Sequence, residues 1–339
     1  MGRKPQPVLE YVRLALLATV FLPIKFFGAV LCVLAFHIVC RLAVLVPADR
    51  RTMAVGELGK LMARSALLFW GYTRVDWVRT DVSPHAHVKG NFPADAATPT
   101  NGAPHAAVIV SNHVSYLDIL VHMSHSAPSF VARGNTADLP LIGLISKYLQ
   151  CIFVNRGFKT KTGEVAGVSG QVKERVELAA LTGPDPNLRP LLLFPEGTTT
   201  NGRCLLPFKT GAFLAGAPVR PVVLEYGADR VSAAWESIDF VWHAFLMLAN
   251  ATHSVTAYEL PVYVPSEAEK GDPTLYANNV RDMMLRVGGF KASPASLQDS
   301  RAYIALLQGR KPPKGSCAAL ALDGASPAEV AAGKAKKEK

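Results

Sequence analysis

Cysteine is scarce in this sequence, and its spacing shows no pairing pattern. Five cysteines are scattered over 339 residues without any C-x-x-C spacing; they are Cys32, Cys40, Cys151, Cys204 and Cys317. An odd number without regular spacing argues against a disulfide framework and against a structural zinc site. Unpaired cysteines fit a reducing compartment, so we expect the folded part of the chain to face the cytosol.

Two further signatures are missing. The sequence has no G-x-S-x-G pattern, which argues against a hydrolase with a nucleophile elbow. It also has no recognisable nucleic-acid-binding motif, although the net charge is +10. A basic chain without such a motif is better matched by an anionic membrane surface or a phosphate-bearing substrate. We therefore predict a membrane or phosphate partner and no nucleic-acid partner.

What the chain does contain is a long apolar N-terminal region, 8–46. Its second part, 26–46, is long enough to span a bilayer, since about 20 apolar residues suffice. His37 and Arg41 make it an imperfect span, and Pro23 divides the region. Two interpretations are open: one transmembrane helix, or a proline-broken pair of helices embedded in one leaflet. Either way, we predict that residues 1–60 anchor the chain in a lipid bilayer.

From residue 108 onward, short β-branched runs alternate with helical patterns. The expected strands are 108–110, 129–132, 151–154, 191–194 and 219–225, and the expected helices between them are 115–125, 141–149 and 168–181. This alternation predicts an α/β fold with a largely parallel central sheet flanked by helices. Further on we expect a strand at 258–264 and a helix at 274–287, while 240–248 reads either as a buried helix or as a second interfacial contact.

The predicted domains follow from these patterns. Residues 61–265 form the catalytic domain, 266–310 a C-terminal helical extension and 311–339 a disordered basic tail. A Pro- and Ala-rich surface loop is expected at 93–104, directly before the first strand of the catalytic pattern.

The stretch 108–118, VIVSNHVSYLD, is the centre of the predicted site. A strand ends, His113 stands in the loop, and a helix signal follows with Ser115 and Asp118. Asp118 could reach back to one ring nitrogen of His113 and leave the other nitrogen free to act as a general base. In the alternative interpretation, Asp118 closes a capping box with Ser115 and His113 is an ordinary loop residue.

Two more strands end in polar groups. Strand 151–154 leads to Arg156, and strand 191–194 leads to Glu196 and Gly197, with Lys209 further along. The carboxyl ends of parallel strands share one edge, so these groups converge with His113. A base, an acid and cations around a glycine turn predict a site for a phosphate-bearing substrate. Individually, Arg156 and Lys209 could be solvated surface charges, and Glu196 could anchor a turn.

Four segments together resemble a known family. NHVSYLD, FVNRG, FPEGTTTNG and VRPVV match, in order and spacing, the four motif blocks of the glycerolipid acyltransferases, the PlsC-like lysophospholipid acyltransferases. The resemblance runs from about residue 23 to residue 286. It is closest to the branch that acylates lysophosphatidylcholine and lysophosphatidylethanolamine.

The resemblance implies a mechanism. His113 would take the proton from the free hydroxyl of a lysophospholipid, Asp118 would support it, and the hydroxyl would attack acyl-CoA directly without an acyl-enzyme. The residues expected to bind substrate are Asn112, Arg156, Glu196, Gly197, Thr198 and Lys209. Acyl-CoA would be a co-substrate, and no metal or tightly bound cofactor is implied. Lysophosphatidic acid as acceptor, or a non-catalytic membrane scaffold, are the alternatives.

Two features concern regulation and location. Many members of this branch carry C-terminal calcium-binding loops, but no D-x-D-x-D-G pattern occurs here, so we predict no calcium-binding module. The final residues, KKEK, resemble a dilysine retrieval signal. They predict an endoplasmic reticulum membrane protein whose catalytic domain faces the cytosol, whereas a generic basic tail is the alternative.

Overall fold

A computed structural model describes residues 8–80, 105–154, 167–183, 185, 187–227, 231–236, 238–307 and 309–312. Three sequence predictions fall outside these residues: Arg156, the loop at 93–104, and the C-terminal tail from 313 onward with its KKEK end. They stay predictions.

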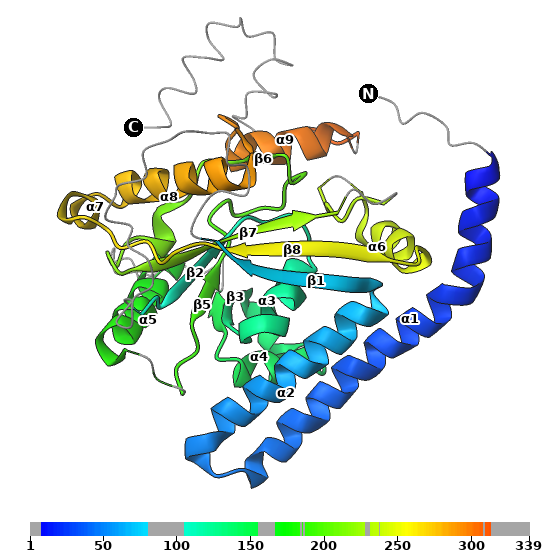
Figure 1. Ribbon diagram of the computed structural model, residues 1–339, viewed down its shortest axis with the longest axis horizontal. Helices are drawn as coiled ribbons and strands as arrows, with labels where there is room; N and C mark the ends of the chain where they lie inside the picture. Colours follow the sequence, from blue (N-terminus) through cyan, green and yellow to red (C-terminus); the bar gives the residue numbers. More distant parts are fainter. Residues whose placement is uncertain are drawn as a thin grey trace, which may run out of the picture.

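A seven-stranded sheet lies at the centre of the molecule, in the order β1-β8-β7-β2-β5-β3-β4 (Figure 1). Its strands are β1 (Tyr72–Arg79), β2 (Val108–Ser111), β3 (Ser129–Arg133), β4 (Ile152–Val154), β5 (Leu191–Leu193), β7 (Val219–Tyr226) and β8 (His253–Glu259). The five strands from β7 to β4 are parallel to one another. β8 is antiparallel to β7 and parallel to β1, so the sheet is mixed only at one side. The predicted α/β fold is confirmed.

Helices cover both faces of the sheet. The helices are α1 (Val8–Leu42), α2 (Ala48–Phe69), α3 (Asp118–Ser126), α4 (Ile142–Tyr148), α5 (Val168–Thr182), α6 (Phe240–Ala249), α7 (Glu267–Gly271), α8 (Pro273–Gly288) and α9 (Leu297–Leu307). Short 3-10 turns occur at Ala43–Leu45, Gly134–Asp138 and Thr210–Ala212, and β6 (Cys204–Leu205) pairs with β9 (Lys291–Ala292).

The core is divided by the sheet into two apolar clusters. On β2, Ile109 packs in the cluster with α1 to α4 and α6, whereas Val108 and Val110 pack in the cluster with α5 and α8. Alternate residues of a strand point to opposite faces, and a strand covered on both faces must be apolar throughout. This explains the uninterrupted apolar run that precedes the polar residues 111–113.

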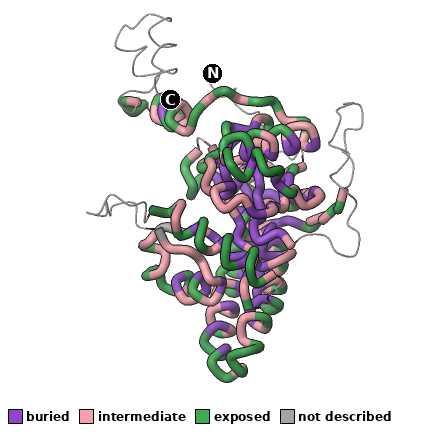
Figure 2. Tube along the Cα trace, turned by 90° about the vertical axis from the view of Figure 1, so that its left-hand side faces the viewer, coloured by how far each residue is buried: buried purple, intermediate pink, exposed green. Residues whose placement is uncertain are grey.

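The N-terminal region is one helix that continues through Pro23 and turns back only at 43–47 into α2. Of the two interpretations that the sequence left open, the structure therefore shows the helix that is not broken at Pro23. Residues Lys25, Cys32, Phe36 and Cys40 form a buried face against the rest of the protein, and this packing holds the helix together although proline removes one hydrogen bond. By length and composition, 12–45 could cross a membrane. Exposed residues gather where α1 joins α2, at the lower end of Figure 2.

Other element boundaries also differ from the sequence predictions. The strand expected at 258–264 is β8 and ends at Glu259, since its pairing with β1 and β7 fixes the earlier register. The helix expected from residue 115 begins at Asp118, and Leu117, rather than Ser115, precedes it. Residue 60, the expected domain boundary, lies inside α2, and α8 packs in a core cluster through Tyr276 and Val280. The division into domains stays a prediction.

Candidate active site

His113 and Asp118 are in direct contact. Nδ1 of His113 lies 2.8 Å from Oδ2 of Asp118, as the spacing of the two residues suggested. A carboxylate only accepts hydrogen bonds, so the proton of the neutral imidazole belongs on Nδ1 and the lone pair on Nε2. The Asp118 side chain is fully buried, whereas that of His113 is 20% exposed. The buried Asp118 carboxylate therefore fixes Nδ1 of the imidazole, while part of the His113 ring remains accessible to solvent.

Asp118 also holds the loop that carries His113. Its Oδ2 accepts the backbone N–H groups of Val114 and Ser115, at 2.7 and 3.0 Å. Its second oxygen, Oδ1, accepts the hydroxyl of Tyr226. Burial and the neighbouring carboxylate raise the pKa of Tyr226 well above its ordinary value, so this tyrosine stays protonated and donates. Three donors besides the imidazole thus fix the Asp118 carboxylate.

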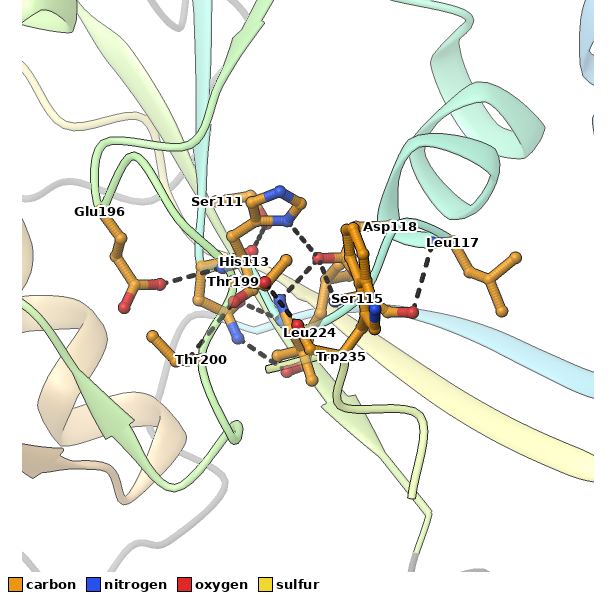
Figure 3. A network of polar contacts seen from close by, with 12 residues as sticks. Ser111, His113, Ser115, Leu117, Asp118, Glu196, Thr199, Thr200, Leu224 and Trp235 are labelled. Carbon is orange, nitrogen blue, oxygen red and sulfur yellow. Dashed lines mark hydrogen bonds and ion pairs between the residues drawn. The ribbon is translucent and has the colours of Figure 1, made fainter. Parts of the chain in front are cut away.

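Segments from two other strands clamp the same loop (Figure 3). The carboxylate of Glu196 accepts the backbone N–H of His113 at 2.9 Å, and the backbone N–H of Thr200 donates to the His113 carbonyl at 2.8 Å. The backbone N–H of Trp235 donates to the Val114 carbonyl at 2.9 Å. Both sides of the loop backbone are therefore fixed by residues that follow β5 and β7, which limits the movement of the imidazole.

Glu196 is directed toward backbone groups. Its Oε2 accepts the N–H of Leu206 at 3.1 Å, in addition to the bond from His113, and the residue is only 1% exposed. Burial raises the pKa of this carboxyl to about 7, since an ionised carboxylate is poorly stabilised away from water. The geometry corresponds to the anchoring interpretation of Glu196, and its side chain does not line the cavity described below.

Asn112 likewise bonds to the backbone. Its side-chain amide donates to the carbonyl of Leu224 at 3.0 Å and accepts the N–H of Leu224 at 2.7 Å. Asn112 directly follows β2, and Leu224 lies in β7, so the side chain extends the pairing of two parallel strands by one residue. Because the side-chain nitrogen and oxygen of Asn112 both have hydrogen-bond partners, this polar residue can be buried beside the candidate base.

The phenyl ring of Phe194 covers one face of the imidazole. The two ring centroids are 4.0 Å apart and the planes differ by 13°. Phe194 also makes an edge contact with the ring of His122. His122 is fully buried, and its burial lowers the pKa of the imidazole to about 3. His122 is therefore a neutral packing residue, and Phe194 restricts rotation of the His113 ring.

A cavity of about 680 Å³ borders His113. Gly197, Lys209, Thr210 and Arg301 contribute to its wall. Gly197 has a φ of +72°, and a Cβ at this position would lie 2.3 Å from Nζ of Lys209, so glycine allows the lysine to pass close to the turn. The predicted meeting of His113, Gly197 and Lys209 is present. Thr198 follows in the same turn, half-buried.

A second cavity, of about 350 Å³, is almost entirely apolar and is lined from α1, α2, α3, α4 and β3. Ile119, Phe130 and Val131 belong to the walls of both cavities. The cavity beside His113, whose wall is partly polar, is thus separated by these three side chains from an apolar cavity lined by the N-terminal helices. A ligand with a polar head and an aliphatic chain has the matching distribution of chemistry.

Two residues whose side chains contact the His113–Asp118 pair, Tyr226 and Phe194, were absent from the sequence prediction. β7 is parallel to β2, so the end of β7 lies at the same edge of the sheet as His113, and a tyrosine there was a detectable signal. Phe194 was assigned only to a strand. Among the described residues, no group of three His, Cys, Asp or Glu side chains is placed to hold a metal.

The family model described as Acyltransferase matches residues 86–225, which include both residues of the His113–Asp118 pair. The chain is 38% identical over 342 residues to lysophospholipid acyltransferase LPEAT1 of Arabidopsis thaliana, covering 91% of this chain and 84% of that protein. The chain belongs to the PlsC-like acyltransferase family, in the branch of these plant and animal enzymes. It is accordingly an acyltransferase, and the predicted resemblance is confirmed.

Other members are more distant or longer. Human lysophosphatidylcholine acyltransferase 1 is 34% identical over 224 residues, which cover 64% of this chain but only 38% of that protein. The crystal structure of the 1-acyl-sn-glycerophosphate acyltransferase PlsC from Thermotoga maritima superposes with a TM-score of 0.50 at 19% identity, covering 81% of this chain and 95% of that one. This likeness supports the fold.

Proposed function

We propose that this protein transfers an acyl group from acyl-CoA to the free hydroxyl of a lysophospholipid, either lysophosphatidylcholine or lysophosphatidylethanolamine. The observation that carries the proposal is the His113–Asp118 contact of 2.8 Å at the wall of a cavity. The Arabidopsis and human relatives, named for lysophospholipid and lysophosphatidylcholine acylation, support the choice of acceptor.

The reaction uses His113 as general base. Nε2 takes the proton of the acceptor hydroxyl while the oxygen attacks the thioester carbonyl, and Asp118 stabilises the resulting imidazolium through Nδ1–H. When the tetrahedral intermediate collapses, the C–S bond breaks and the imidazolium returns the proton to the leaving thiolate. The products are a diacyl phospholipid and free CoA. No acyl-enzyme, metal or bound cofactor takes part in this scheme.

Each part of the substrates has a proposed place. Lys209, the turn of Gly197 and Thr198, and Arg156 bind the phosphate of the acceptor, since lysine and arginine are common phosphate ligands. An acyl chain occupies the 350 Å³ apolar cavity. Asn112 and Glu196 act on the substrate through the loop that they position. The site of action is the endoplasmic reticulum membrane, with the catalytic domain on the cytosolic side.

The test is acyl transfer in membranes that contain the full chain. Labelled oleoyl-CoA is offered with lysophosphatidylcholine, lysophosphatidylethanolamine or lysophosphatidic acid in separate reactions. His113→Ala is expected to lower the rate about 10²- to 10⁴-fold, the usual contribution of a general base. His105→Ala is the matched control, because His105 precedes the N-terminal end of β2 whereas His113 follows its C-terminal end.

Each outcome has a distinct meaning. Activity on one of the two zwitterionic acceptors, lost with His113→Ala, supports the proposal. A preference for lysophosphatidic acid would change the proposed acceptor but leave the proposed general-base mechanism in place. Full activity of His113→Ala would exclude the general-base role, and a folded, membrane-bound protein inactive on every acceptor would point to a non-catalytic scaffold.

A further inference from the structure

The first turn of α6 is exposed although it is apolar. Phe240, Val241 and Trp242 are 47, 72 and 49% exposed, while the other end of the helix, at Met247 to Ala249, is buried in the core. Consecutive helical residues point about 100° apart, so three exposed neighbours mean that this entire turn projects from the protein. These three residues are called the α6 turn below.

The α6 turn is held in place from within. The Asp239 carboxylate caps the helix by accepting the N–H of Val241 at 2.9 Å. The indole of Trp242 stacks on the ring of Phe245, with centroids 5.2 Å apart and planes within 15°. Phe240 makes an edge contact with Tyr116 at 5.0 Å. These contacts present an apolar surface with a fixed shape, which lowers the entropic cost of binding.

The same helix is joined to α1. The buried ammonium group of Lys25 donates to the carbonyls of Asn250 and Ala251, directly after α6, and α6 lies beside α1 in Figure 1. On α1, the exposed residues Val20 and Ile24 are separated by one turn, and the outward apolar face continues along the helix. A helix of ten residues is about 15 Å long, so the α6 turn lies within about this distance of the Lys25 contact.

We propose that the α6 turn enters the boundary between lipid headgroups and acyl chains, beside the outward face of α1. A lipid surface is the occupant that matches the continuity of these two apolar surfaces. Tryptophan and phenylalanine favour that depth of a bilayer, because an amphipathic ring is stable between water and hydrocarbon. This inference concerns a surface, so it holds whether or not the acyl-transfer proposal is correct.

The contact has a consequence for the candidate active site. Tyr116 belongs to the loop between His113 and Asp118, and its ring touches both Phe240 and His243 of α6. A bilayer that holds the α6 turn therefore also restrains this loop through Tyr116. The protein would meet the membrane at two elements, α1 and α6, with the loop of His113 linked to the second.

Tryptophan fluorescence tests the proposal in the full chain. The chain has four tryptophans, Trp70, Trp77, Trp235 and Trp242, and a Trp242→Phe variant isolates the emission of Trp242 by difference. Proteoliposomes are prepared with phosphatidylcholine that is unbrominated, brominated high on the acyl chain, or brominated near its end. We expect a loss of Trp242 emission that is larger with the shallow bromines than with the deep ones.

A matched variant controls for exposure alone. Leu181, on α5, is 86% exposed and lies on the opposite face of the sheet. Leu181→Trp in the Trp242→Phe background should show no loss of emission in brominated vesicles. The His113→Ala variant should give the same Trp242 quenching as the unmodified chain, which separates membrane contact from catalysis.

Two results would overturn the proposal. Equal emission of Trp242 in brominated and unbrominated vesicles would place the α6 turn outside the bilayer. A change of oligomeric state in Val241→Asp, measured in detergent, together with unquenched Trp242, would instead assign the α6 turn to a second copy of the chain.

Discussion

The carboxylate of Glu196 accepts the backbone N–H of His113 at 2.9 Å, although the residues are 83 positions apart. The acid of the FPEG segment thus holds the loop of the candidate base, while its other oxygen accepts the N–H of Leu206. Gly197, the next residue, forms part of the cavity wall. One short turn therefore combines a buried structural acid with an exposed surface for ligand.

The first prediction concerns pH. Burial raises the pKa of Glu196 from the ordinary 4.5 to about 7. Between these values the folded protein keeps a proton that the unfolded chain has lost, so this group's contribution to stability falls as the pH rises from about 4.5 to 7. The loss is expected to approach about 3 kcal/mol, at 1.36 kcal/mol per pKa unit.

The measurement is thermal unfolding in detergent at several pH values from 5 to 8. Glu196→Gln removes the titrating group and should flatten its part of the pH dependence. At low pH the variant should already be less stable by about 1–3 kcal/mol, because an amide nitrogen cannot accept a backbone N–H. Parallel curves for the two proteins would contradict the raised pKa.

Tyr226→Phe tests the donor to the second oxygen of Asp118. Loss of one hydrogen bond to a charged acceptor should lower kcat about tenfold, with little change in KM. Tyr303→Phe, at an exposed position of α9, is the control, and an unchanged kcat would reduce Tyr226 to a packing residue.

Asn112→Ala should affect folding more than binding. Its amide bonds to both backbone groups of Leu224, and removal leaves a buried donor and a buried acceptor unpaired, each at a cost of about 1–3 kcal/mol. We expect a clearly lower Tm and an unchanged KM for the acceptor in the fraction that stays folded. A raised KM with an unchanged Tm would return Asn112 to substrate binding, as the sequence resemblance implied.

Ala66→Phe tests the apolar cavity. Ala66 contributes to its wall from α2, and a phenyl ring there would fill space available to an acyl chain. The preference among saturated acyl-CoA donors should shift to shorter chains, with the rate for short chains retained. Leu61→Phe, exposed on the same helix, should leave the preference unchanged, and equal chain-length profiles for all three proteins would place the acyl chain elsewhere.

Local patterns in the sequence carried much of the fold. The strand 108–110 was recognisable because a strand buried on both faces is apolar throughout. The helix 168–181 was recognisable because the backbone hydrogen bonds of a helix join residues that are close in sequence. Prediction failed where distant contacts decide the outcome. The strand ending at Glu259 takes its register from β1 and β7. The sequence left open whether the N-terminal region breaks at Pro23, and α1 is continuous there because one of its sides is packed against other elements.

The sequence alone indicated the family, a largely parallel sheet, and a possible contact of His113 with Asp118, since these depend on short spacings and on the shared edge of parallel strands. Only the tertiary structure decided how Tyr226, Asn112 and Glu196 are used. Each satisfies hydrogen bonds of a segment far away in the chain. The hydrogen-bond partner of such a side chain depends on which backbone or carboxylate group the completed fold buries beside it, and this cannot be read from the spacing of residues in the sequence.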